Sequence, residues 1–381
     1  MAHLKLPEWR ELSRDEQIPI INLPIDRSYF VQGGPGTGKS ILAIHRIARI
    51  KDLDPDRITR ILVYNKPLQL HLHDALMAAG LDGKAAQTCH KWIGNLTGLP
   101  LPSTLWGYNW TMVREAVLRR AGGSKLFGHL IIDEAQDIPV QLLRILNEVA
   151  ETVTLLADGK QAINPEANAE ADVSIEEMIP RCFQLGLNSI FYLSLNFRNT
   201  QPILDAAHSI KPPRSNEISD RAVRQDGPKP ILRKASVQDF VQRVETYHAN
   251  NPADRIGVAV PRQRDFEIYK QLKNSEVPVQ IYRNRHVYDG SYSACAKGVT
   301  ILTYEVMKGL EFDAVFLPLL NEAYLHREST EKELETSRNL FYVASTRARS
   351  FLEFSYENEL PDSWLTQALT SACQAGHIRR A

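Results

Sequence analysis

The chain has 381 residues, of which 43% are hydrophobic, and its 45 basic and 45 acidic residues balance to a formal net charge of zero. The length predicts more than one domain, and the hydrophobic fraction is sufficient for a buried core. A balanced charge excludes a global attraction to nucleic acid, but it leaves a local basic groove open.

The sequence also predicts where the protein resides. Its 4 cysteines are far apart and form no C-x-x-C pair, which indicates a reduced protein. The segment 1–15 is charged and carries no apolar core of a signal peptide. Since no apolar run approaches the length of a membrane span, we expect a cytoplasmic protein with no membrane partner.

Residues 33–40 fit the phosphate-binding pattern G-x-x-x-x-G-K-[ST]. An apolar stretch at 28–31 predicts a strand before this loop, and the pattern at 41–48 predicts a helix after it. Glycines let the backbone wind around an anion, and the helix presents its positive end. Lys39 is expected to reach the β and γ phosphates and Ser40 to hold Mg²⁺. The loop that would hold the phosphates consists of Gly33, Gly34, Pro35, Gly36, Thr37, Gly38, Lys39 and Ser40.

Just upstream, Ser13 and Glu16 have the spacing of a capping box and predict a helix that carries Gln17. A carboxamide offers both a donor and an acceptor, which suits the edge of an adenine ring. A glutamine taken alone is more often a surface residue.

Further strands are expected at 60–65 and 85–90, with a helix from about residue 68 and an amphipathic helix at 112–120. Three histidines, at 71, 73 and 90, could suggest a metal site, but no ligand cluster accompanies them, so we interpret them as structural or solvated. Trp106 and Trp110 are interpreted as core residues, with base stacking as the alternative.

The apolar run at 129–132 predicts a buried strand that ends in Asp133 and Glu134. In phosphate-loop hydrolases an aspartate at a strand end holds Mg²⁺, and a neighbouring carboxylate orients the attacking water. A similar strand is expected at 152–158, and Gln161 would then face the same edge of the sheet. The alternative is an acidic turn without a catalytic role.

Strands alternating with helices argue for an α/β fold with parallel sheets covered by helices. A strand at 190–195 ends this series, and we interpret the Pro-rich and charged stretch 211–234 as a surface connection. A second alternating series follows, with strands expected at 256–260, 277–282, 299–304, 314–317 and 351–356, and helices at 264–272 and 337–349. The predicted domains are 1–194, which carries the phosphate loop, and 195–381, which has no such loop.

Arg198 and Arg347 are candidates for a contact with the γ-phosphate, because an arginine there stabilises transition-state charge. The alternative is that Arg347 and Arg349 form surface ion pairs.

The order of these motifs is more specific than any one of them. The series runs Gln17, GGPGTGKS, YNKPL, TCHKW, IIDEAQD, ADGKQ, NFRNT, TYEVMKGLEF and LFYVASTRAR. From Gln17 to Tyr356 the chain resembles the superfamily 1 helicases of the UvrD/Rep type. The resemblance implies two RecA-like domains that bind ATP in the cleft between them.

The resemblance also implies roles for matching positions. Gln17 and Phe197 would contact adenine, Glu311 would approach the ribose, and Gln161, Arg198 and Arg347 would sense the γ-phosphate. Lys39 and Glu134 would act in hydrolysis, and Ser40 and Asp133 would hold Mg²⁺. The residues expected to touch nucleic acid are Asn65, Thr88, His90 and Thr303, with Tyr64, Trp92 or Trp106 as aromatic substitutes.

Two departures qualify this picture. The gaps between motifs are too short for the large accessory subdomains of the family, which suggests a minimal two-domain core. The aromatic of the T-x-H block is Cys89, and Ala162 to Glu166 replaces the stacking residues that follow Gln161 in the family.

The first hypothesis is therefore an ATP-driven helicase or translocase on single-stranded DNA, moving 3′ to 5′, with RNA left open as a substrate. The alternative is a regulated ATPase subunit of a larger complex, for example with a nuclease. A small-molecule kinase is a third reading, which the arginines of the second domain disfavour.

Overall fold

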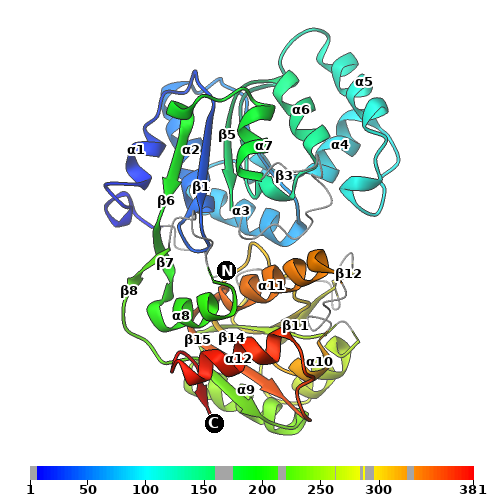
Figure 1. The fold of residues 1–381 in the computed structure, drawn as a ribbon. Coiled ribbons are helices and arrows are strands. Elements are labelled where there is room, and N and C mark those ends of the chain that lie inside the picture. Colours follow the sequence, from blue (N-terminus) through cyan, green and yellow to red (C-terminus); the bar gives the residue numbers. More distant parts are fainter. Residues whose placement is uncertain are drawn as a thin grey trace. The chain divides into compact units, whose positions relative to one another are not determined.

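A computed structural model describes residues 7–158, 175–212, 220–261, 263–283, 286–287, 296–323 and 330–381. These residues divide into two compact units, one ending at Ser194 and the other beginning at Leu195. Each unit is a sheet with helices on both faces (Figure 1).

The first unit is built on a parallel sheet with the strand order β3-β2-β4-β5-β1-β6. Its strands are β1 (Tyr29–Gly33), β2 (Thr59–Val63), β3 (Ala86–Thr88), β4 (Phe127–Ile132), β5 (Ala150–Ala157) and β6 (Ile190–Leu193). Its helices are α1 (Gln17–Ile21), α2 (Lys39–Leu53), α3 (Lys66–Ala78), α4 (Cys89–Thr97), α5 (Trp110–Ala121), α6 (Val140–Val149) and α7 (Ile175–Cys182).

Alternate side chains of these strands enter two separate cores. Helices α1, α2 and α3 pack on one face, where Val31 and Ile61 point. Helices α4, α5, α6 and α7 pack on the other, where Phe30 and Leu62 point. A strand buried on both faces must be apolar at nearly every position, which explains the continuous runs that made these strands recognisable in the sequence.

The second unit carries a sheet with the order β12-β11-β13-β10-β14-β15-β9-β16, parallel except for the β11–β12 pair. Its strands are β9 (Ile231–Lys234), β10 (Arg255–Ala259), β11 (Val279–Arg283), β12 (His286–Val287), β13 (Gly298–Leu302), β14 (Phe312–Leu317), β15 (Ala348–Tyr356) and β16 (Arg379–Arg380). A separate parallel pair is formed by β7 (Leu195–Thr200) and β8 (Arg221–Arg224).

Helices also cover the second sheet. Phe240 and Ile268 bring α9 (Val237–Asn250) and α10 (Asp265–Lys273) onto one core with β10 and β14. The remaining helices are α8 (Gln201–Ile210), α11 (Glu331–Ser345) and α12 (Trp364–Gln374). On α11, Phe341 stacks on Phe354 of β15 and meets Trp364 of α12 edge-on.

Three sequence-based expectations about local structure are wrong. The strand expected at 85–90 ends at Thr88, because its hydroxyl caps α4. The helix expected at 337–349 begins at Glu331, behind a capping box of Thr330 and Glu333, and ends at Ser345. The stretch 211–234 is more than a connection, since its described part supplies β8 and β9.

The expected capping box at Ser13 takes another form. The Ser13 hydroxyl accepts from the Glu16 amide in a turn, and α1 begins only at Gln17.

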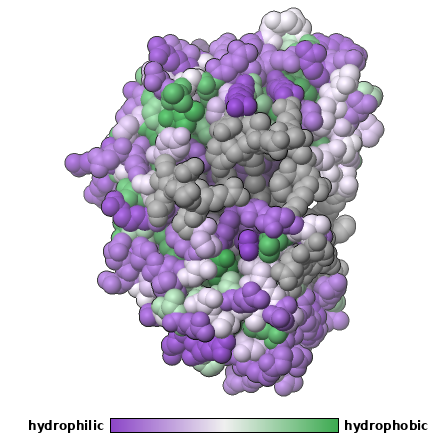
Figure 2. All heavy atoms as spheres, viewed as in Figure 1, coloured by the Kyte–Doolittle hydropathy of each residue, from purple (hydrophilic) through white to green (hydrophobic). Residues whose placement is uncertain are grey.

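Polar residues cover most of the surface in Figure 2, with apolar residues in small groups among them. No helix in the described ranges is long and apolar enough to cross a membrane.

The first unit buries a histidine side chain in its sheet. His129 of β4 is fully buried, and its ring nitrogens lie 2.7 Å from the Thr152 hydroxyl and 2.9 Å from the Thr154 hydroxyl. Desolvation, with smaller contributions from Arg46 and Arg57, lowers the pKa of His129 from 6.5 to about 3. The folded unit therefore keeps this ring neutral where the unfolded chain binds a proton.

We predict that acid destabilises the first unit through His129. Between the two pKa values the unfolded state binds more protons, so stability falls as pH falls, by on the order of 1 kcal/mol per pH unit. His129→Gln cannot titrate and should show a shallower slope in urea unfolding followed by tryptophan fluorescence. Asp133, whose pKa burial raises, acts in the opposite sense but is common to both proteins. Equal slopes in the two proteins would contradict the assignment.

Candidate nucleotide and nucleic-acid sites

The phosphate loop connects β1 to α2. Gly38 has a φ of 84°, a conformation that disfavours residues with a side chain, and α2 begins at the next residue. The Lys39 ammonium is buried and donates to the carbonyls of Gly33 at 2.8 Å and Gly34 at 2.9 Å. It also lies 3.9 Å from a carboxylate oxygen of Asp158. The loop therefore folds around the lysine charge, at the place where the motif predicts a phosphate.

Gln17 is part of this loop's support. Its side-chain nitrogen donates to the Thr37 carbonyl at 3.0 Å, and its side-chain oxygen accepts from the Ser13 amide at 3.0 Å. Gln17 is buried, so it is no ordinary surface residue. The carboxamide joins the segment before α1 to the backbone of the phosphate loop.

Arg46 secures the other end of α1, a role that no sequence motif indicated. It is fully buried on α2, two turns beyond Lys39, and its guanidinium donates to the carbonyls of Ile21, Leu23 and Pro24. Burial lowers its pKa to about 10, which still leaves it charged at neutral pH. Gln17 and Arg46 together fix α1 to the phosphate loop and its helix.

Ser40 and Asp133, far apart in the chain, meet at the carboxyl edge of the sheet. The Ser40 hydroxyl donates to Asp133 at 2.6 Å, and the carboxylate is fully buried. Burial and the neighbouring Glu134 raise the pKa of Asp133 to about 6, against the opposing effects of Ser40 and Lys39. Hydroxyl and carboxylate oxygens are ligands that Mg²⁺ prefers, and a cation would relieve the cost of burying this charge. These two residues therefore fit a magnesium site.

Glu134 follows in an unusual backbone conformation. Its φ of 56° is in the left-handed region, which is uncommon for a residue with a side chain and is frequent at functional sites. Gln136 donates to its carboxylate at 2.5 Å and accepts from the Asp158 amide at 3.0 Å. Gln136, which sequence reasoning left without a role, thus links the ends of β4 and β5. Gln161 lies outside the described residues.

The residues expected to touch nucleic acid in the first unit are at the same edge of the sheet. Asn65 caps α3 by accepting from the Leu68 amide at 2.9 Å, and Thr88 caps α4 by accepting from the Lys91 amide at 3.2 Å. Since Val63 of β2 pairs with Thr88 of β3, the two helices start side by side. Helix N-termini carry partial positive charge, which suits a phosphate backbone.

Two lysines that the sequence did not single out stand at these helix starts. Lys66 is the first residue of α3, Lys91 is in the first turn of α4, and both are exposed. Desolvation and the charge of Lys91 lower the pKa of Lys66. The two ammonium groups are thus close enough to repel each other, and a shared anion would relieve that repulsion.

The aromatic residues expected to contact nucleic acid differ in their exposure to solvent. Trp92 is buried in the core, 5.8 Å from the Phe127 ring, so little of its ring is open to a stacking base. Tyr64 is half-buried against Trp106, and burial raises its pKa to about 12. His90 is half-buried and contacts the Tyr108 hydroxyl at 3.1 Å.

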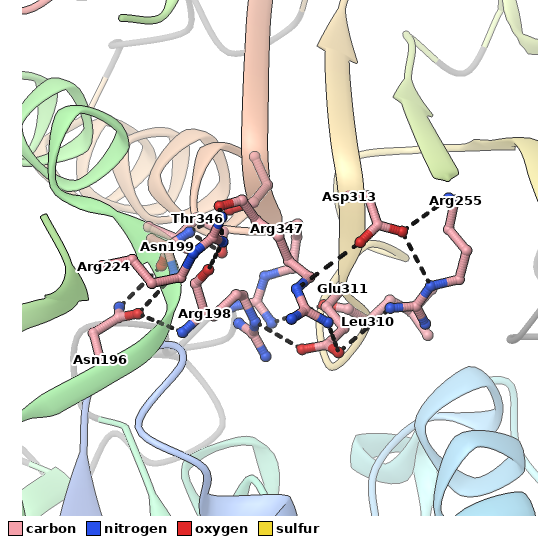
Figure 3. Close-up of polar contacts among 12 residues, drawn as sticks. Asn196, Arg198, Asn199, Arg224, Arg255, Leu310, Glu311, Asp313, Thr346 and Arg347 are labelled. Atoms are coloured by element: carbon pink, nitrogen blue, oxygen red, sulfur yellow. Dashed lines mark hydrogen bonds and ion pairs between the residues drawn. The ribbon is translucent and has the colours of Figure 1, made fainter. Parts of the chain in front are cut away.

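In the second unit, Arg198 and Glu311 are joined directly. Arg198 is on β7, and Glu311 is the residue just before β14. Arg198 Nε donates to the Glu311 carboxylate at 3.1 Å (Figure 3). Arg255 approaches the other oxygen of the same carboxylate at 3.4 Å, and Arg349 lies 3.8 Å from it. The predicted phosphate-sensing and ribose-binding residues therefore form one charged group at the amino ends of β10, β14 and β15.

Arg347 is buried beside this group. Its guanidinium donates to the carbonyls of Val343 at 3.0 Å and Leu310 at 3.3 Å, and its own carbonyl accepts from the Phe312 amide. It is therefore no surface ion pair, whereas Arg349 does form ion pairs with Glu311 and Asp313. Phe197 is half-buried on β7, and Thr303 is buried just after β13.

Comparisons with known proteins agree with the motifs in both units. Residues 289–359 match the UvrD-like helicase C-terminal domain family. Residues 26–203 match the DNA/RNA helicase domain of Schlafen group 3.

Individual relatives point the same way. A Mycoplasma pneumoniae protein named "Probable DNA helicase" is 26% identical over 237 residues, covering 59% of this chain and 42% of its own length. An Acanthamoeba polyphaga mimivirus protein named "Putative ATP-dependent DNA helicase R568" is 28% identical over 250 residues, covering 59% of this chain and 34% of its own length. The ATP-dependent DNA helicase PcrA of Staphylococcus epidermidis is 25% identical over 127 residues, covering 32% of this chain and 17% of its own.

The matches thus span less than half the length of these relatives. The family profiles nonetheless cover both α/β units, and the phosphate loop, the acidic strand end and the arginine segments occur in the expected order. The family matches, the named relatives and the order of the motifs together support a superfamily 1 helicase of the UvrD/Rep type.

Proposed function

We propose that this chain is an ATP-driven DNA helicase that acts in the cytoplasm and couples ATP hydrolysis to 3′ to 5′ movement on single-stranded DNA. The observation that carries the proposal is the phosphate site of the first unit. There the Lys39 ammonium fills the loop, and Ser40 and Asp133 place two oxygen ligands together. Polarity and translocation rest on the family resemblance.

In this proposal the loop amides and Lys39 hold the β and γ phosphates, and Gln17 and Phe197 contact adenine. To do so, Lys39 exchanges the carbonyls of Gly33 and Gly34 for phosphate oxygens. Mg²⁺, held by Ser40 and Asp133, would neutralise developing charge on the phosphates. Glu134, oriented by Gln136, accepts a proton from the attacking water.

Arg198 and Arg347 sense the γ-phosphate in the proposal, together with Gln161, and Glu311 approaches the ribose. Of the two arginines, Arg198 is the better candidate for this role. Its guanidinium is paired with Glu311, and Arg255 and Arg349 also neutralise that carboxylate, so Arg198 can turn toward a phosphate without leaving Glu311 unpaired. Arg347 donates to backbone carbonyls and holds the Leu310–Phe312 segment in position.

Single-stranded DNA would bind through its backbone at the starts of α3 and α4. Asn65, Thr88, Lys66 and Lys91 supply the positive helix ends and charges, with Tyr64, His90 and Thr303 as further contacts. RNA offers the same phosphates. The alternative, an ATPase subunit working with a nuclease, finds less support, since the relatives named above are helicases.

We predict that single-stranded DNA stimulates ATP hydrolysis by the wild-type chain. Lys39→Ala should reduce turnover to background, because it removes the charge at the β and γ phosphates. Glu134→Gln should bind a fluorescent ATP analogue as tightly as wild type but lose at least a hundredfold in turnover, within the range for a general base. The measurement is steady-state phosphate release with and without an oligonucleotide.

Turnover of Lys39→Ala close to wild type would overturn the phosphate site. If DNA leaves the turnover unchanged, the helicase proposal is contradicted, whereas the proposal that the chain hydrolyses ATP still holds.

We predict that Gln17→Ala weakens ATP binding about tenfold, because the phosphate loop loses one buried hydrogen bond at Thr37 and a contact to the base. Titration with a fluorescent ATP analogue measures the change. Gln69→Ala is the matched control, since Gln69 is also buried and donates to a backbone carbonyl, that of Ala86. The prediction fails if both variants bind the analogue equally well.

We predict that Lys66→Ala with Lys91→Ala lowers DNA affinity and flattens its salt dependence. Each lysine that contacts a single strand contributes about 0.7 to the slope of log affinity against log salt, so the pair should remove about 1.4. Fluorescence anisotropy with an oligonucleotide across a salt series gives the slope.

The matched control is Lys84→Ala with Lys125→Ala, because both lysines are exposed and precede their strands at the amino edge of the same sheet. An equal loss of slope in the control pair would show a nonspecific charge effect.

A further inference from the structure

We infer that Arg255 is a positioning residue for the nucleotide reaction, acting through Glu311 on Arg198. The inference rests on the proposed function, which places Arg198 at the γ-phosphate. No sequence motif singled out Arg255, which is simply the first residue of β10.

Four charged residues, Arg198, Glu311, Arg255 and Asp313, contact one another in that order. Arg198 binds one oxygen of the Glu311 carboxylate at 3.1 Å, and Arg255 binds the other at 3.4 Å. Arg255 is fixed in turn by Asp313, which accepts from its backbone amide at 2.9 Å and lies 3.7 Å from its Nε (Figure 3). Glu311 is therefore held from both sides, and its orientation depends on both arginines.

The sheet explains why Arg255 can do this. Strand β10 is flanked by β13 and β14, and Ile256 pairs with Ala314, so Arg255 lies beside Asp313 at the start of the neighbouring strand. Arg255 is 14% exposed and Glu311 27% exposed, so the pair is partly shielded from water. Shielding strengthens the attraction between the charges and makes an unpaired carboxylate costly.

The charges of the group explain why Arg255 matters for the reaction. If Arg198 turns toward a phosphate, it must give up some of its contact with Glu311. Arg255, with Arg349 at a longer distance, keeps that carboxylate neutralised. Without Arg255, the Glu311 carboxylate would be less neutralised and would hold Arg198 more tightly.

The test is the ATPase rate of Arg255→Gln in the full chain. We expect kcat to fall about tenfold with a change in KM below about threefold, because the loss concerns transition-state charge rather than ground-state binding. Arg255→Lys should recover only part of the rate, since an ammonium cannot bridge two carboxylates as a guanidinium does. Should Arg255→Gln fail to fold, the lysine variant carries the test.

Arg264→Gln is the matched control. Arg264 also lies between two acids of the second unit, 2.8 Å from Glu267 and 2.6 Å from Glu322, and is outside the group around Glu311. It should keep the wild-type kcat. A thermal melt of each variant separates loss of fold from loss of rate.

A double-mutant cycle tests the route through Glu311. If Arg255 acts on Arg198 through that carboxylate, Arg255→Gln should change kcat little further in a Glu311→Gln background. If the two substitutions instead lower kcat by factors that multiply in the double variant, this inference is overturned and the proposed function is not. The same holds if Arg255→Gln has the same kcat as Arg264→Gln. A wild-type chain without hydrolysis above the Lys39→Ala background would instead overturn the proposed function, and this inference with it.

Discussion

A parallel sheet places the carboxyl ends of all its strands at one edge, and the candidate sites of the first unit depend on this constraint. The phosphate loop follows β1, Asp133 follows β4, Asp158 follows β5, and Asn65 and Thr88 are at the ends of β2 and β3. The hydrogen bond between Ser40 and Asp133 closes this arrangement, because it joins the helix after the phosphate loop to a strand two positions away in the sheet. Nucleotide chemistry and DNA binding are thus proposed for the same edge of this sheet.

The second unit places its charged group at the opposite edge of its own sheet. Glu311, Asp313 and Arg255 are at the amino ends of β14 and β10, and Arg349 is at the start of β15. Three arginines, Arg198, Arg255 and Arg349, lie around the carboxylates of Glu311 and Asp313. Such an arrangement can receive an anion without leaving a partly buried acid unpaired, which is the condition that a phosphate-sensing arginine must satisfy.

At the proposed DNA site of the first unit, the described residues offer positive charge and helix ends, whereas the aromatic candidates are buried or half-buried. Trp92 and Cys89 are in the core, and Tyr64 and Trp106 pack on each other. Stacking on bases needs an exposed face, whereas contact with phosphates needs donors and positive charge, which Lys66, Lys91 and the capped helices provide. In the proposed helicase, a strand held through its backbone by these charges would be bound with little regard to base sequence.

The sequence alone determined the α/β class, the phosphate loop, the Asp133–Glu134 pair and the order of the motifs, because strands buried on both faces and glycine-rich loops leave local patterns that need no partner. It did not determine where α4 and α11 begin, since a single capping hydroxyl decides this. Nor did it show that Trp92 is buried, that β9 belongs to the second sheet, or that Arg46, Gln136 and Arg255 support the candidate sites. An arginine or glutamine has the same local pattern on a surface as in a network, so only the tertiary structure, which brings distant acids and carbonyls within hydrogen-bonding distance, decided these roles.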